Sequence, residues 1–377
     1  KANKADMRML FIYRLNVDFQ QSKGIVEKEN AIAKAFRYHG YEVDILCNND
    51  LGIILNGELI QKRYFYQTND LVFNQIMNQL NNKKYDLIYL RFSPLSYYQY
   101  KALSEARANF PNLKIWVAMP NYPFLYEFNF FKRMLLKTLI SNKWNHMHLC
   151  LNRILHLGPE KEIFGIKTIP FDNGIEIKTV TSLKRPLKND LQINLIYVGT
   201  FWPWQGFDLL LKGIAKYSQE QMPYKINLIL VGDGPELSNL KSKASEFGIQ
   251  DLVKFIPPKY GEELDNIFGE AHIGIGTLHH ESRQLSYAAN LKHRNYTARG
   301  IPFIYNVPDH SFHGIKGAYL FDQADFNLRQ IIEWYQTDIL PNIENVSGGL
   351  QEYANTVLSW NAIVKKVLIA ENLPHGN

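Results

Sequence analysis

The sequence predicts an α/β protein made of two doubly wound parallel-sheet, Rossmann-like domains. Short apolar runs ending near glycine or polar residues alternate with stretches of helical period, and this pattern stops and restarts near residue 190. The apolar runs are nearly continuous rather than alternating, which is typical of strands covered on both faces. A length of 377 residues, with 46% hydrophobic and 21% charged residues, suits two globular domains.

The first half contains the elements of one such domain, predicted to span residues 1–180. An apolar strand at 7–15 leads into a helix at 24–40, whose last residue, Gly40, is a typical helix end. Three further strands are predicted at 41–47, 86–92 and 113–119.

The second domain is predicted at 193–345, after a polar linker at 181–192 that contains a proline and has no clear period. Its strands are expected at 193–199, 226–232, 252–256 and 272–278, and its helices at 207–217, 235–248 and 261–269. The remaining segment, 346–377, is predicted to be helical. Ligands of open α/β sheets bind at the carboxyl ends of the strands, so two facing sheets would form a binding cleft.

Charge and composition narrow the classes of partner. A formal charge of +6 is compatible with anionic small molecules or a lipid surface, and the sequence has no recognisable nucleic-acid motif. Cys47 and Cys150 lack metal-ligand spacing, which favours a reducing compartment. The chain lacks an apolar run of about 18 residues, and its polar start is unlike a secretion signal. A cytoplasmic location is expected, with contact at the membrane surface as an option.

Two glycines end buried strands of the second domain, Gly199 before "TFWPWQG" and Gly232 before "DGP". Glycine at these places allows tight turns and close approach of a ligand to the backbone. Ordinary strand-to-helix turns use glycine as well, so both interpretations stay open. Neither loop has the glycine spacing of a dinucleotide-binding fingerprint. Gly24 lies between the first strand and its helix. It could let a substrate phosphate or sugar approach the backbone, or it could be an ordinary glycine at a helix start.

The segment "NLKHRNYTARGIP" places Lys292, His293 and Arg294 at the start of a predicted helix. Cations at a helix N-terminus oppose the helix dipole unless an anion lies there, so the cluster predicts a diphosphate site. Lys292 would supply a point charge, and Arg294 could fork around two oxygens or pair with an acid elsewhere. Solvated charges at a helix end are the alternative.

The segment 128–158 combines basic residues with Phe, Leu, Met and Trp and has no acidic residue. Such a face can rest on an anionic membrane. A core-packed helix pair with lysines at its rim is the alternative.

Taken in order, several segments resemble retaining, nucleotide-sugar-dependent glycosyltransferases of the GT-B fold, a group that includes bacterial capsule, O-antigen and exopolysaccharide enzymes. The matching segments are "DNGIEI", "YVGTFWPWQGFDLLLKGI", "LILVGDGPELSNLK", "LKHRNYTARGIPFIYN" and "YANTVLSWNAIVKKVL", with looser matches in the first half. The resemblance implies a donor site in the second domain, an acceptor site in the first, and a last helix that crosses back to the first domain.

The sequence departs from that family at two positions. The family usually has two glutamates eight residues apart, one facing the donor sugar and one holding the ribose; the corresponding residues here are Tyr287 and Asn295. Asn295 keeps one acceptor oxygen, whereas Tyr287 cannot replace a carboxylate's charge. An Arg and a Lys that commonly hold the diphosphate correspond to Thr200 and Gln205.

The resemblance also implies roles for other residues. Contacts to the nucleotide base are expected near Pro258 and Lys259, and the acceptor is expected near Gly24 and Asn121. Lys292 and Arg294, together with the helix N-terminus, would stabilise the leaving diphosphate without a metal or other cofactor.

The function predicted is therefore transfer of a sugar from a nucleoside diphosphate to a saccharide or lipid-linked acceptor in surface-polysaccharide synthesis. The changes at Tyr287 and Asn295 leave a second hypothesis open, a catalytically impaired subunit that binds a glycan or stabilises a partner. A nucleotide-sugar epimerase of the same fold is a third.

Overall fold

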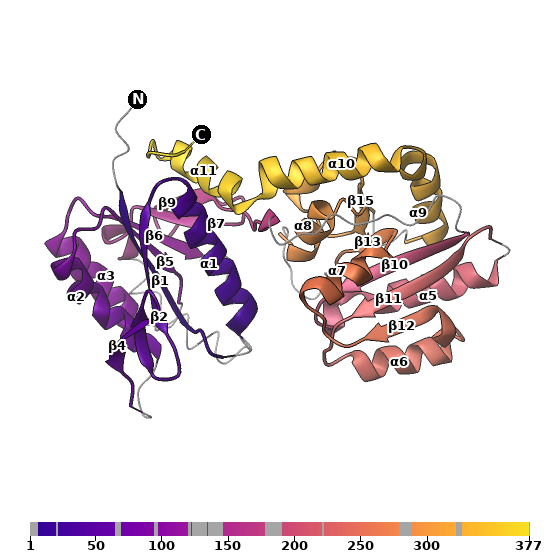
Figure 1. Ribbon diagram of the computed structural model, residues 1–377, viewed down its shortest axis with the longest axis horizontal. Helices are drawn as coiled ribbons and strands as arrows, with labels where there is room; N and C mark the ends of the chain where they lie inside the picture. The colour runs from indigo at the N-terminus through magenta and orange to yellow at the C-terminus, as the bar shows by residue number, and fades with distance from the viewer. Residues whose placement is uncertain are drawn as a thin grey trace. The chain divides into compact units, whose positions relative to one another are not determined.

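The computed structural model describes residues 7–19, 22–64, 69–93, 97–119, 122, 134, 146–177, 191–220, 222–278, 289–321 and 326–376. The chain divides into two compact units, one formed by residues 1–172 with 360–377 and the other by 173–359. Each unit is an α/β structure centred on its own sheet (Figure 1). The predicted fold class is confirmed.

The sheet of the first unit has nine strands in the order β4-β3-β2-β1-β5-β6-β7-β9-β8. The central strands are parallel, and β3, β4 and β8 add antiparallel pairs at the edges. The strands are β1 (Arg8–Asn16), β2 (Glu42–Asn48), β3 (Gly52–Leu55), β4 (Glu58–Lys62), β5 (Leu87–Arg91), β6 (Lys114–Met119), β7 (Arg153–His156), β8 (Glu162–Ile163) and β9 (Ile166–Pro170).

Helices cover this sheet because each has an apolar face. They are α1 (Lys23–Tyr38), α2 (Gln75–Asn82), α3 (Tyr97–Asn109) and α11 (Trp360–Ala370). In α1, Ile32 and Phe36 are fully buried, and they share one core cluster with Val364 and Val367 of α11. Packing of these apolar faces attaches the last helix of the chain to the first unit.

The boundaries between units differ from those expected from the sequence. Residues 173–180 belong to the second unit rather than the first, and so do residues 346–359, which were expected to be part of the crossing segment. The division near the C-terminus falls at Ser359, where an extended backbone (ψ 147°) separates α11 from the preceding helical turns. Most of the expected linker, 181–190, lies outside the described residues.

The second unit has a six-stranded parallel sheet in the order β12-β11-β10-β13-β14-β15. Its elements are β10 (Gln192–Val198), α5 (Phe207–Gln219), β11 (Lys225–Val231), α6 (Leu237–Glu246), β12 (Val253–Ile256), α7 (Gly261–Gly269), β13 (Ile273–Ile275), α8 (Leu291–Ala298), β14 (Phe303–Tyr305), β15 (Ala318–Leu320), α9 (Leu328–Trp334) and α10 (Ile343–Tyr353). A π-helical turn, Ala354–Leu358, extends α10.

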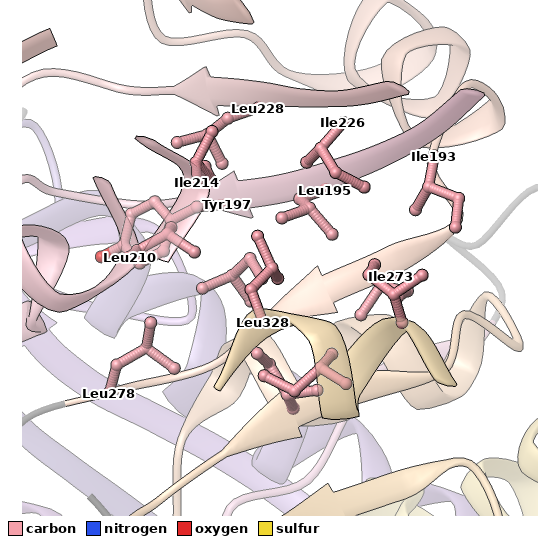
Figure 2. Close-up of a cluster of buried hydrophobic side chains, with 14 of the residues drawn as sticks. Ile193, Leu195, Tyr197, Leu210, Ile214, Ile226, Leu228, Ile273, Leu278 and Leu328 are labelled. Carbon is pink, nitrogen blue, oxygen red and sulfur yellow. The ribbon is translucent and has the colours of Figure 1, made fainter. Parts of the chain in front are cut away.

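The core of this sheet explains why β10 and β11 are almost continuously apolar. Ile193 of β10 packs with Ile226 of β11 and Leu210 of α5 in one cluster (Figure 2). Ile196 and Ile229, on the opposite face of the sheet, belong to a second cluster. Strands β11 and β12 lie on one side of β10, and the next strand in the sequence, β13, lies on the other side. The strand order therefore reverses between β10 and β13, and such switch points are where open α/β sheets bind ligands.

Among the described residues, no helix is both long and apolar enough to cross a membrane.

Candidate functional site

The residues that follow β10 and β13 meet at the switch point of the second sheet. The loop after β10 carries Thr200 and Gln205, and β13 is followed by Thr277. Helix α8 brings Lys292 to the same place. We call Tyr197, Thr200, Gln205, Thr277 and Lys292 the switch-point cluster.

The ammonium of Lys292 is the centre of this cluster. Its Nζ donates to Oε1 of Gln205 at 2.9 Å and to the hydroxyl of Tyr197 at 3.2 Å. It also lies 4.2 Å from the centre of the Tyr197 ring, within the range of a cation–π interaction. The side chain of lysine is flexible in solution, and these three contacts hold it at the carboxyl end of β10.

The neighbours of Lys292 are held in turn by hydrogen bonds. The Tyr197 hydroxyl donates to the carbonyl oxygen of Thr200 at 3.0 Å, and the Thr277 hydroxyl donates to Oε1 of Gln205 at 3.3 Å. Tyr197 and Thr277 were not anticipated from the sequence. The sequence does contain a signal for them, because each places a hydroxyl group at or just beyond the carboxyl end of a predicted buried strand.

Burial sets the electrostatics of the cluster. Desolvation lowers the pKa of Lys292 to about 7, since the charged form loses water and gains only neutral partners. No carboxylate among the described residues pairs with its ammonium. A desolvated cation surrounded by hydroxyl and amide groups is suited to an anion, because an anion would supply the missing countercharge.

Arg294 has a different environment from the one expected. Its side chain is fully buried, and its guanidinium forms a two-pronged ion pair with Asp309. The same group donates to the carbonyl oxygen of Asn173 at 3.0 Å and to the Ser311 hydroxyl at 3.1 Å. Of the two alternatives considered for Arg294, these contacts correspond to pairing with an internal acid. A direct fork around diphosphate oxygens does not fit them.

His293, between these two cations, is a core residue. Its Nδ1 lies 3.1 Å from Oδ2 of Asp309, and its ring stacks on Phe303. Burial lowers the pKa of His293 to about 4 despite the nearby carboxylate. The imidazole is therefore neutral at physiological pH. Of the three basic residues in this segment, Lys292 is the one whose charged group lies in the switch-point cluster.

Asn295, at the position expected to hold the ribose, already has partners on both ends of its amide. Its Nδ2 donates to the carbonyl oxygen of Leu291 at 3.0 Å, and its Oδ1 accepts from Arg299 at 2.9 Å. Arg299 in turn is buried against Asp265, with a contact of 2.6 Å. A ribose hydroxyl would share Oδ1 with Arg299 rather than bind a free acceptor.

The two strand-end glycines are explained by packing between their loops. A Cβ on Gly232 would overlap the carbonyl oxygen of Gly199, and φ is +146° at Gly232 and +149° at Gly199. The loops are also joined by a hydrogen bond of 2.9 Å from the amide of Phe201 to the carbonyl of Asp233. These contacts between the two loops account for both glycines as residues of tight turns, without a ligand close to the backbone.

The remaining expected site residues are not part of the switch-point cluster or lie outside the described chain. Lys259 precedes α7 and pairs with Glu263 at 3.1 Å, and Pro258 is exposed beside it. Gly24 is the second residue of α1, and a Cβ there would meet no atom within 4 Å. Asn121 and Tyr287 are outside the described residues, and so is most of the basic segment 128–158.

Metal ligands are not grouped in the described parts of the two units: no set of three or more His, Cys, Asp and Glu side chains could hold an ion there.

Comparison with known proteins agrees with this architecture. Residues 181–283 match the family model of glycosyl transferases group 1. An uncharacterized glycosyltransferase of Haemophilus influenzae is 31% identical over 134 residues, 35% of this chain. A D-inositol 3-phosphate glycosyltransferase of Saccharomonospora viridis is 30% identical over 95 residues, 23% of this chain. The matched segments span only 36% and 22% of these two relatives.

Solved structures extend the similarity to nearly the whole chain. A glycosyltransferase from Rickettsia africae superposes with a TM-score of 0.66 at 11% identity, and sucrose-phosphate synthase from Thermosynechococcus elongatus with 0.63 at 13%. Both alignments cover 97% of this chain and 98% of the other. A lipopolysaccharide outer core galactosyltransferase has a TM-score of 0.58 at 12% identity, covering 97% of this chain and 100% of its own.

These identities are low enough that the structures establish shared architecture alone. The chain has the two-domain GT-B fold, and its residues 181–283 carry the sequence pattern of the glycosyl transferases group 1.

Proposed function

We propose that this protein is a glycosyltransferase that moves a sugar from a nucleoside diphosphate to a saccharide or lipid-linked acceptor. The observation that carries the proposal is the Lys292 ammonium, held 2.9 Å from Gln205 at the switch point with no carboxylate among its described partners. The match of residues 181–283 to the glycosyl transferases group 1 supports the same reaction class.

The chemistry requires stabilisation of a leaving anion. The bond between the anomeric carbon and the phosphate oxygen breaks, and its electron pair stays on the diphosphate, where negative charge grows. The acceptor hydroxyl oxygen bonds to the same carbon and gives its proton to the departing phosphate oxygen. A cation fixed in a desolvated site stabilises that charge more than one in water does. In this proposal Lys292 is the catalytic residue, with Thr277 and Tyr197 as hydroxyl neighbours of the diphosphate.

Arg294 acts in this scheme by holding α8. Its ion pair with Asp309 joins the helix to the segment after β14, and Asn295 is the next residue of the same helix. We therefore assign Arg294 a positioning role rather than contact with the donor.

The finer parts of the proposal concern stereochemistry and biological setting. We propose that transfer retains the anomeric configuration, uses no metal and serves surface-polysaccharide synthesis at the cytoplasmic face of a membrane. The net charge of +6 and the basic, aromatic segment 128–158 support a site near anionic lipid. The lipopolysaccharide galactosyltransferase among the structural neighbours offers a precedent on the same fold.

A second candidate is a transferase-like subunit with impaired catalysis. Asn295 favours this candidate, because its amide replaces a carboxylate and both its ends already bind within the chain. Such a subunit would bind a glycan or a partner without binding a nucleoside diphosphate.

Calorimetric titration of the full chain with UDP, GDP and dTDP separates the two. We expect at least one to bind, and Lys292→Met to weaken that binding about 10- to 100-fold, the range for a lost hydrogen bond to a charged group. Lys212→Met, which changes an exposed lysine of α5, is the matched control and should bind as the wild type does. If none of the three nucleotides binds, the subunit without donor binding is the better account. Equal affinity of wild type and Lys292→Met would remove Lys292 from the donor site.

A further inference from the structure

Two tryptophans stack on each other in the loop that carries Gln205. The rings of Trp202 and Trp204 have centroids 4.9 Å apart and planes inclined by 9°, a parallel stack. Trp202 keeps 39% of its surface exposed, and Trp204 is half-buried. The sequence "TFWPWQG" thus places a flat indole surface beside the switch-point cluster.

The loop that presents this surface is held rigidly. Phe201 is fully buried, and its ring packs against Tyr197 and Phe207, which anchors the loop in the core. The amide of Trp202 donates to the carbonyl of Thr200, and its own carbonyl accepts from the amide of Gln205, both at 3.1 Å.

A short 3-10 turn, Pro203–Gln205, and the left-handed Gly206 (φ 73°) complete the loop. Proline restricts the backbone before any ligand arrives, so little conformational freedom remains to be lost on binding. The backbone that carries the two stacked indoles is therefore preorganised.

Packing within the described chain does not explain the exposed face of Trp202. Phe201 is fully buried and supplies the apolar anchor of the loop, whereas Trp202 leaves 39% of its surface exposed. Tryptophan at an exposed, preorganised position is the residue type most enriched where proteins contact ligands and partners.

We propose that the exposed face of Trp202 is a platform for a saccharide ring of the acceptor. One face of a hexose presents C–H groups and is apolar, whereas its rim carries hydroxyls. Such a face packs on an indole through dispersion and weak C–H contacts, and leaves the rim free for hydrogen bonds. This inference rests on the proposed function, because it places the acceptor beside the diphosphate-binding cluster.

The strand order favours a saccharide over the nucleotide base as the ligand. The resemblance to the GT-B family implies a base beside Pro258 and Lys259, after β12, which is two strands away from β10 in the sheet. Two strand spacings are roughly 10 Å, so a base bound after β12 would lie well away from the β10 loop. The tryptophans lie in the β10 loop itself, with Trp204 adjacent to Gln205, where the transferred sugar and its acceptor would meet the diphosphate.

Saturation-transfer difference NMR on the full chain tests this platform. The probes are methyl α-glucoside, methyl α-galactoside and methyl N-acetyl-α-glucosaminide, with UDP and GDP measured in parallel. We expect saturation on the ring protons of at least one glycoside, a loss of most of that signal in Trp202→Ala, and partial retention in Trp202→Phe. Tyr38→Ala, which removes an exposed aromatic ring of α1, is the control and should keep the full signal.

The parallel measurements with UDP and GDP distinguish a failure of the saccharide platform from a failure of the proposed glycosyltransferase function. Unchanged UDP or GDP binding in Trp202→Ala, together with lost glycoside signal, supports the saccharide platform. A glycoside signal that is absent in the wild type, or equal in wild type and Trp202→Ala, overturns it even when a nucleotide binds. Loss of nucleotide binding in Trp202→Ala also overturns it, because the indole would then serve the base. Failure of every nucleotide to bind the wild type counts against the proposed function instead.

Discussion

The ammonium of Lys292 lies 4.2 Å from the centre of the Tyr197 ring, so a lysine of α8 caps the face of a tyrosine at the end of β10. The two residues are far apart in the sequence and meet because β10 and β13 are neighbours in the sheet. Burial lowers the pKa of the ammonium, and raises the pKa of the Tyr197 hydroxyl above its usual range. The protein thus holds a destabilised cation where an anionic ligand would stabilise it.

The first prediction concerns the pH dependence of stability in the unliganded protein. Lys292 has a folded pKa of about 7 and an ordinary value of 10.5. Between these two pKa values the unfolded chain binds more protons than the folded chain, so the contribution of Lys292 to the free energy of unfolding rises with pH. Below pH 7 the lysine is charged in both states, and the folded protein bears the full cost of desolvating the ammonium.

Lys292→Met removes this ionisable group. Its stability relative to the wild type should therefore be greater at about pH 6 than at about pH 9, as measured by urea unfolding. Lys212→Met, at an exposed position, should show no such trend. A pH-independent difference between wild type and Lys292→Met would show that the ammonium is hydrated.

The second prediction concerns the missing carboxylate at position 295. Asn295→Glu supplies a second acceptor oxygen and a negative charge, so one oxygen can bind Arg299 and the other a ribose hydroxyl. We expect the affinity for the preferred nucleoside diphosphate to rise about 10-fold in calorimetry, the effect of one charge-assisted hydrogen bond. Asn295→Gln is the uncharged control. Equal affinities for the Glu and Gln variants would place the ribose elsewhere.

The third prediction concerns the buried ion pair. Removing one partner leaves an unpaired charge with no water around it, so Arg294→Met and Asp309→Asn should each lower the free energy of unfolding by about 3–5 kcal/mol. Arg329→Met breaks a solvent-exposed pair with Glu220, where water screens the charges, and should lower the free energy of unfolding far less than either buried change. Urea denaturation at neutral pH compares the three. A small effect at both buried positions would contradict the positioning role of Arg294.

The fourth prediction contrasts two glycines. Gly232→Ala places a methyl group against the carbonyl of Gly199 at a φ of +146°, and should destabilise the protein by about 1–3 kcal/mol or more. Gly24→Ala meets no atom within 4 Å and lies in the first turn of α1, so it should stabilise by up to about 1 kcal/mol. Thermal unfolding measures both. A drop in acceptor-dependent activity in Gly24→Ala, with stability unchanged or raised, would support a substrate contact there.

Much of the fold follows from local sequence. The helix expected at 261–269 is observed as Gly261–Gly269, and the strand expected at 193–199 as Gln192–Val198. These elements are identified well because hydrophobic period and glycine or proline boundaries act over a few residues. The break at Ser359 was not anticipated, since it depends on which unit buries the helix on either side.

The candidate site shows where local reasoning reaches its limit. The sequence by itself determined the α/β architecture and the presence of three basic side chains near the start of α8. Tertiary structure decided their roles: Asp309 neutralises Arg294, burial keeps His293 uncharged, and Lys292 reaches Tyr197 and Gln205. The physical reason is that the free energy of a charged group depends on its solvation and on countercharges brought close by folding, neither of which is contained in the spacing of residues along the chain.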